Sequence, residues 1–163
     1  MKKLLLILLC VPMIGIGQTN SSKNSDYDKL IGHTYSNSEI EEKLEEWKGP
    51  YFWGLENSES LELFISYYYK DNQRLVIAKK IIGRNGPEPI WEIIGCHIII
   101  LEENQTFYTD IALDEKPDDR IIAVVILEDW ECSEILKAWK LNIYSGEFEH
   151  IDVSSLSCYS VFN

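Results

Sequence analysis

Histidine is scarce in this chain of 163 residues, which contains only His33, His97 and His150. A Ser-His-Asp triad needs a histidine aligned with a nucleophile, and no serine stands in the G-x-S-x-G pattern that frames one. His97 directly follows Cys96 on an expected strand, so these two side chains point to opposite faces and do not share a metal ion. The shortage of histidine therefore argues against the commonest hydrolytic and zinc chemistries.

Sequence motifs for metal binding are missing as well. The chain contains no H-E-x-x-H, no paired C-x-x-C and no EF-hand loop. The acidic segment from Asp114 to Asp119 includes Pro117 and lacks the ligand order of a calcium loop, so we expect a solvated loop there. We accordingly predict no metal and no cofactor.

Basic residues are outnumbered, with 15 lysines and arginines against 27 aspartates and glutamates and a formal net charge of −12. A field of this sign repels nucleic acid and anionic lipid and attracts cationic molecules. The composition therefore argues against nucleic-acid binding and favours a cationic protein as a partner.

The chain begins with the pattern of a bacterial secretory signal. Lys2 and Lys3 form a basic start, residues 4–16 are an apolar run, and small residues precede an expected cleavage site after Gly17. The run is shorter than the roughly 20 residues of a membrane-spanning helix, so no permanent anchor is expected. Cys10 is not preceded by the small residue that a lipidation site needs. We expect an exported protein, periplasmic or extracellular, whose net charge becomes −14 when the two lysines are removed.

An amphipathic helix is expected shortly before Gly49-Pro50, which supplies a stop. Ser36 is its N-cap and Glu39 is the acid of a capping box. The apolar stripe of this helix consists of Ile40, Leu44 and Trp47. Its outer face is rich in glutamate, and like charges one turn apart destabilise a helix. We therefore expect residues 37–47 to be held by packing on a sheet.

The rest of the chain alternates short β-rich runs with turns. Gly95 predicts a bulge, and Gly146 predicts the positive-φ position of a hairpin turn. The run 120–127 is apolar almost throughout, as in a central strand buried on both faces. The expected strands span residues 61–69, 74–82, 90–101, 106–113, 120–127, 135–143 and 148–153.

These elements define a fold class. Residues 18–30 are polar and predict a flexible leader behind the signal, and residues 31–163 have the length of a single domain. Short connections favour antiparallel pairing. We expect an α+β fold with a curved antiparallel sheet of about six to seven strands, open or partly closed, and the amphipathic N-terminal helix packed on it.

Three cysteines, Cys96, Cys132 and Cys158, remain after cleavage in a compartment where disulfides persist. They form at most one internal bridge and leave one thiol buried or free, and three pairings are possible. We favour Cys96 with Cys158, because a bridge from the sheet would tie down a polar C-terminus.

Exposed aromatic residues give the candidate binding sites. Tyr68 is the middle of three successive tyrosines on one strand, so at least one of them points outward if the other face packs the core. A second candidate is an acidic cluster around an aromatic residue. It consists of Glu128, Asp129, Trp130 and Glu131. Aromatic surfaces suit both protein contacts and sugars, so a cationic protein or a glycan is the expected partner.

The end of the chain resembles small exported bacterial proteins of unknown function. The resemblance rests on residues 119–125, 137–140 and 146–148 and on Cys158. It covers about a quarter of the chain and implies neither an activity nor a ligand. The oligomeric state stays open.

Three functions remain in view, and the third is that of a purely structural envelope component. The first is a secreted or periplasmic binding module without enzymatic activity, for example an inhibitor or immunity-type protein directed at a cationic protein. The alternative is a small envelope hydrolase that uses paired carboxylates in the concave face of its sheet.

Overall fold

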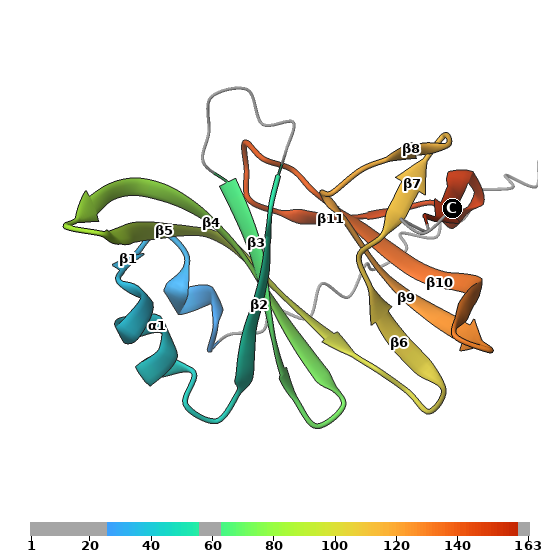
Figure 1. Ribbon diagram of the computed structural model, residues 1–163, viewed down its shortest axis with the longest axis horizontal. Helices are drawn as coiled ribbons and strands as arrows, with labels where there is room; N and C mark the ends of the chain where they lie inside the picture. Colours follow the sequence, from blue (N-terminus) through green and yellow to red (C-terminus); the bar gives the residue numbers. More distant parts are fainter. Residues whose placement is uncertain (1–25, 56–62, 160–163) are drawn as a thin grey trace, which may run out of the picture.

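The computed structural model describes residues 26–55 and 63–159, and the predicted signal peptide, residues 1–17, lies outside them. In this part of the chain, one α-helix and two short 3-10 helices accompany twelve strands, and all strand pairs are antiparallel (Figure 1). None of the described helices is long and apolar enough to cross a membrane.

The helix α1 (Asn37–Lys43) begins as predicted. Ser36 caps it, since the backbone N–H of Glu39 donates to Ser36 Oγ and the N–H of Ser36 donates to the Glu39 carboxylate at 2.7 Å. The helix ends at Lys43, before the predicted end at residue 47. Continuation through Glu45 and Glu46 would place these acids one turn from two other glutamates. The predicted apolar stripe is nevertheless buried at Ile40, Leu44 and Trp47.

The described part of the chain begins within the range predicted as a leader. The 3-10 helix η1 (Asp28–Leu30) precedes the first strand. The Trp47 indole N–H donates to the Tyr27 hydroxyl at 3.1 Å, and the two rings meet edge to face. An aromatic contact therefore attaches the start of the described chain to the segment that follows α1.

The largest sheet has five strands in the order β1-β5-β4-β3-β2. The predicted hairpins and the bulge near Gly95 are present, since the β4–β5 register shifts between the pairs Ala78–Gly95 and Lys79–Ile93. Its strands are β1 (Thr34–Tyr35), β2 (Lys48–Gly54), β3 (Leu63–Lys70), β4 (Gln73–Asn85) and β5 (Glu88–Ile100).

Two smaller sheets follow. The four-stranded sheet has the order β11-β10-β9-β6 and contains β6 (Gln105–Tyr108), β9 (Ile121–Glu128), β10 (Glu131–Leu141) and β11 (Phe148–Ile151). The three-stranded sheet has the order β12-β7-β8 and contains β7 (Ile111–Leu113), β8 (Lys116–Pro117) and β12 (Leu156–Cys158), with the 3-10 helix η2 (Val153–Ser155) before β12. The three-stranded sheet and α1 lie at opposite ends of the molecule (Figure 1).

The prediction of an α+β, sheet-rich fold is confirmed, whereas the prediction of one curved sheet is wrong. The described strands form three separate sheets. The chain leaves the five-stranded sheet after β5, and β6 pairs with β9 instead of continuing the first sheet. Because β9 is apolar on both faces, a further layer must cover each of its sides.

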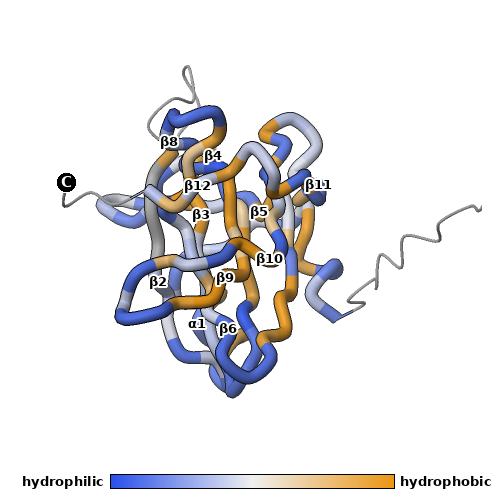
Figure 2. Tube along the Cα trace, turned by 90° about the vertical axis from the view of Figure 1, so that its right-hand side faces the viewer, coloured by the Kyte–Doolittle hydropathy of each residue, from blue (hydrophilic) through white to orange (hydrophobic). Residues whose placement is uncertain are grey.

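Apolar clusters fill the spaces between these layers. One cluster joins Ile40 of α1 to Ile77 of β4, and a second joins Val76 of β4 to Val124 of β9. A third packs Ile111 of β7 against the opposite face of β9. Hydrophobic residues accordingly follow the inner strands, and hydrophilic residues follow the loops (Figure 2).

The strand β9 confirms the prediction of a central strand buried on both faces. Its alternate residues Ile122 and Val124 belong to the cluster shared with the five-stranded sheet. The residues between and beside them belong to the cluster shared with the three-stranded sheet: Ile121, Ala123 and Val125.

The two larger sheets touch through two glycines. Gly95 of β5 faces Gly146 in the β10–β11 turn, which has the predicted positive φ of 76°. A Cβ atom on Gly95 would overlap the carbonyl oxygen of Gly146, and a Cβ atom on Gly146 would overlap the carbonyl oxygen of Ile94. The backbones are therefore in direct contact, and a side chain at either position has no space.

A half-buried histidine lies near this contact. The His97 ring lies 4.9 Å from that of Trp139 and 5.7 Å from that of Phe148, between centroids. Its Nε2 atom is buried and has no hydrogen-bond partner in the described part of the chain. Burial lowers the pKa of His97 from 6.5 to about 4, because the apolar site disfavours the charged ring.

His97 is expected to make the protein sensitive to acid. Between pH 6.5 and pH 4 the unfolded chain binds a proton at His97 that the folded protein does not bind. The free energy of unfolding is therefore highest above pH 6.5 and falls by about 3 kcal/mol by pH 4. Urea unfolding across this range should show the loss in the wild type and in a His150→Gln control. It should be nearly absent in His97→Phe, and an equal loss in all three proteins would rule out this explanation.

Candidate functional site

The acidic and aromatic residues around Trp130 lie together at the tip of the β9–β10 hairpin. Asp129 and Trp130 form the turn, and Glu128 and Glu131 are paired across the two strands beside it. The Trp130 side chain is 95% exposed. The hairpin therefore presents an indole with three neighbouring carboxylates to solvent.

This turn has a backbone geometry that glycine ordinarily supplies. Asp129 has a φ of 50° and Trp130 a φ of 69°, as in a type I′ turn, which favours Asn-Gly. Aspartate tolerates this region, but it costs a bulky residue about 1–2 kcal/mol. The like charges of Glu128 and Glu131 face each other and add to the cost. Trp130 thus lowers local stability without burying its ring, which favours a role in contact with another molecule.

A disulfide holds the same hairpin near its tip. It joins Cys132, close to the turn, to Cys158 in β12. The expectation of one bridge and one buried or free thiol is confirmed, because Cys96 is free and half-buried, and burial raises the pKa of its thiol to about 12. The hairpin is therefore covalently attached to the three-stranded sheet.

The preferred pairing of Cys96 with Cys158 is wrong. Cys96 packs on the face of the five-stranded sheet that α1 covers. Cys158 packs beyond the four-stranded sheet, in the cluster of the three-stranded sheet. Two packed sheets separate these cysteines, whereas Cys132 and Cys158 belong to the same cluster.

Tyr68 is not part of the surface, contrary to the prediction. Its side chain is 3% exposed and packs in the cluster beneath α1, where burial raises its pKa to about 12. Its neighbours Tyr67 and Tyr69 point to the other face, where Tyr51 stacks on Tyr67 at 5.1 Å between ring centroids. The helix α1 decides which tyrosine is buried, and the strand sequence alone does not give that choice.

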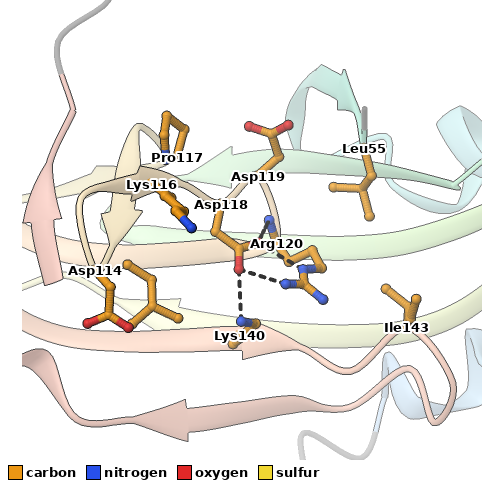
Figure 3. Close-up of a pocket in the computed structure, with 10 residues that line it drawn as sticks. Leu55, Asp114, Lys116, Pro117, Asp118, Asp119, Arg120, Lys140 and Ile143 are labelled. Carbon is orange, nitrogen blue, oxygen red and sulfur yellow. Dashed lines mark hydrogen bonds and ion pairs between the residues drawn. The ribbon is translucent and has the colours of Figure 1, made fainter. Parts of the chain in front are cut away.

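A pocket that the sequence did not predict lies beside the β7–β8 hairpin (Figure 3). Its volume is about 480 Å³, within the range of small-molecule sites. Leu55 and Ile143 contribute apolar walls. The charged lining consists of Asp114, Asp118, Asp119, Lys116, Arg120 and Lys140. Formal charges of the two signs cancel there, so net charge gives this pocket no preference for a cation or an anion.

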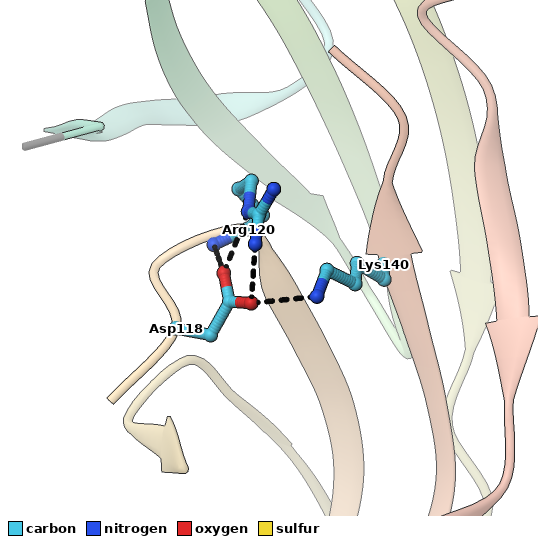
Figure 4. Close-up of polar contacts among 3 residues, drawn as sticks. All are labelled: Asp118, Arg120 and Lys140. Atoms are coloured by element: carbon cyan, nitrogen blue, oxygen red, sulfur yellow. Dashed lines mark hydrogen bonds and ion pairs between the residues drawn. The ribbon is translucent and has the colours of Figure 1, made fainter. Parts of the chain in front are cut away.

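Asp118 is the centre of an ion-pair network in this pocket (Figure 4). Two guanidinium nitrogens of Arg120 donate to its two carboxylate oxygens at 2.8 Å each, and Lys140 Nζ lies 2.8 Å from one of these oxygens. Burial raises the pKa of Asp118, but these hydrogen bonds outweigh it and lower the pKa to about 2. The carboxylate therefore stays ionised and links the start of β9 to β10.

Asp118 lacks the property that a hydrolase requires of its general acid. A general acid needs a carboxyl group with a raised pKa, and the pKa of Asp118 is shifted the other way. Across residues 26–55 and 63–159, no group of three or more histidine, cysteine, aspartate or glutamate side chains is arranged to hold a metal ion. Asp118 therefore acts as an ion-pair partner of Arg120 and Lys140.

No protein-family model, no curated protein and no solved structure matches this chain. The resemblance to small exported bacterial proteins stays a prediction.

Proposed function

We propose that this protein is an exported binding protein without enzymatic activity, and that it contacts a cationic protein through the tip of the β9–β10 hairpin, residues 128–131. The observation that carries this proposal is the 95% exposure of Trp130 at a position with a φ of 69°. Tryptophan is among the residues that most often dominate binding energy in protein interfaces. The surrounding carboxylates would steer a basic partner towards the indole.

The architecture supports this use of the hairpin. The strand β9 is buried on both faces, and the disulfide joins β10 to β12. A binding residue on such a base loses little conformational freedom when a partner arrives, which favours affinity. The disulfide is also compatible with an oxidising compartment outside the cytoplasm.

The hairpin tip favours a protein over a glycan. Carboxylates around an exposed indole complement lysine and arginine side chains, whereas the negative field does not strengthen the binding of a neutral sugar. We therefore place the glycan second and test it in the same experiment.

Replacement of Trp130 by glycine should separate binding from folding. The partner is first captured from envelope and secreted extracts at low salt, on an immobilised protein that begins at Gln18, and identified by mass spectrometry. Titration of that purified partner should then show at least about 30-fold weaker binding for Trp130→Gly, the loss typical of a dominant interface residue. Thermal unfolding of the variant should show equal or higher stability, because glycine adopts a positive φ without strain.

The matched control is Tyr144→Ala, which removes another almost fully exposed aromatic residue from a different turn. It should bind like the wild type. Wild-type affinity should fall when salt rises from about 0.01 M to 0.15 M, as the Debye length shortens from roughly 30 Å to 8 Å. Equal binding by Trp130→Gly and the wild type, or retention of glycans alone, would reject the proposal.

A further inference from the structure

Lys79 is a buried lysine on the side of the molecule opposite the three-stranded sheet. It lies on β4 and is 5% exposed, and its Nζ atom lies 4.2 Å from the centroid of the Trp91 ring. A pocket of about 160 Å³ adjoins it, between α1 and the five-stranded sheet. The other walls include Ile40, Glu41, Pro50, Phe64 and Tyr68. The ammonium group therefore lies beside a small and mainly apolar space.

The surroundings of Lys79 disfavour its charge. No described carboxylate forms an ion pair with it. Burial lowers its pKa from 10.5 to about 8, and the charge of Glu41 on α1 opposes this only in part. The facing Tyr68 of β3 is neutral at physiological pH because its own pKa is about 12, and Trp91 of β5 does not titrate. At pH 7 the Lys79 side chain is a neutral amine in about a tenth of the molecules. This fraction is roughly 300 times that of an ordinary lysine.

Packing alone does not explain a lysine at this position. A well-packed apolar side chain is usually at least as stable as a buried charge. The contact with the Trp91 ring compensates for part of the lost hydration. A lysine activated by loss of water in an apolar pocket is instead the arrangement by which proteins turn this side chain into a nucleophile.

We propose that Lys79 is a covalent binding site for a small aldehyde, held in the pocket beneath α1. The neutral Nζ attacks the carbonyl carbon, and a proton moves from nitrogen to the former carbonyl oxygen to give a carbinolamine. Loss of that hydroxyl group with the remaining nitrogen proton releases one water and leaves a C=N bond. The step needs no oxidant or reductant, and it is reversible. A volume of about 160 Å³ admits an aldehyde with on the order of five non-hydrogen atoms.

Reductive trapping with butanal tests this site. The intact protein from Gln18 onward is incubated with butanal and cyanoborohydride at pH 7, which converts any imine into a stable secondary amine, and the modified lysines are mapped by mass spectrometry. Lys80 is an internal control, since it lies next in the sequence and pairs with Glu92 at 2.8 Å. Lys79 should be modified at least tenfold faster than Lys80, and its rate should saturate with butanal concentration.

Two further comparisons decide the result. Lys79→Arg should remove the fast adduct, whereas Lys80→Arg should leave it unchanged. Diphenylacetaldehyde, which exceeds the pocket, should not react preferentially at Lys79. A Lys79 rate equal to or below that of Lys80, or a rate that rises linearly with butanal, would overturn the proposal. Because these rates come from the wild-type protein, they are decisive even if Lys79→Arg fails to fold.

Discussion

Replacement of Gly146 by alanine should destabilise the protein by at least about 3 kcal/mol. The new methyl group would overlap the carbonyl oxygen of Ile94, and a backbone atom in a packed sheet moves less readily than a side chain. The φ of 76° adds about 1–2 kcal/mol of strain for a residue with a Cβ atom. Urea unfolding followed by circular dichroism at pH 7.5 measures the loss.

The variant Gly86→Ala measures the cost of a positive φ without the steric overlap that occurs in Gly146→Ala. Gly86 has a similar φ of 63°, but a Cβ atom added to it would have no neighbouring atom within 4 Å, so we expect a loss of only about 1 kcal/mol. Gly95→Ala should resemble Gly146→Ala, and the double variant should cost less than the sum because both changes open the same contact. If Gly146→Ala cost no more than Gly86→Ala, the described contact between the sheets would be wrong.

Removal of the Cys132–Cys158 bridge should cost about 3 kcal/mol. The two cysteines are 26 residues apart, and release of a loop of that length restores conformational freedom to the unfolded chain. Cys132→Ala/Cys158→Ala should therefore unfold roughly 10 °C below the wild type in a thermal scan. A reducing agent should lower the melting temperature of the wild type by a similar amount.

The response of two variants to a reducing agent serves as a control. The Cys132→Ala/Cys158→Ala protein should not respond to it, because its remaining thiol is unpaired. Cys96→Ala should respond as the wild type does, since Cys96 takes no part in the bridge. A loss of reductant sensitivity in Cys96→Ala would instead indicate a bridge that includes Cys96.

Local sequence patterns predict the elements of this fold well. Ser36 and Glu39 are three residues apart, so their capping box is readable from the chain alone. Turn residues likewise indicate the hairpins, and Gly146 has the positive φ expected of it. The number of sheets is not readable in this way. It depends on β6 pairing with β9, a contact between distant segments that local propensity does not encode.

The same distinction applies to the sites. The residues around Trp130 are contiguous in sequence, and they lie close together in space for that reason. Lys140 reaches Asp118 only through the β9–β10 register, which no local pattern specifies. The sequence does indicate that Lys79 is buried, since this residue alternates with the buried residues Leu75 and Ile77 along the same strand. A charged residue on the apolar phase of a strand is thus worth treating as a candidate site.

The double burial of β9 has a mechanical consequence. Because its alternate residues pack in two different clusters, separation of either neighbouring sheet exposes one face of the same strand. A load applied at Trp130 would therefore pass into the strand that both clusters share, and the hairpin should not detach as an independent unit. Amide hydrogens in the middle of β9 should exchange with solvent only through global unfolding, whereas those of β1 should exchange through local opening of the sheet edge.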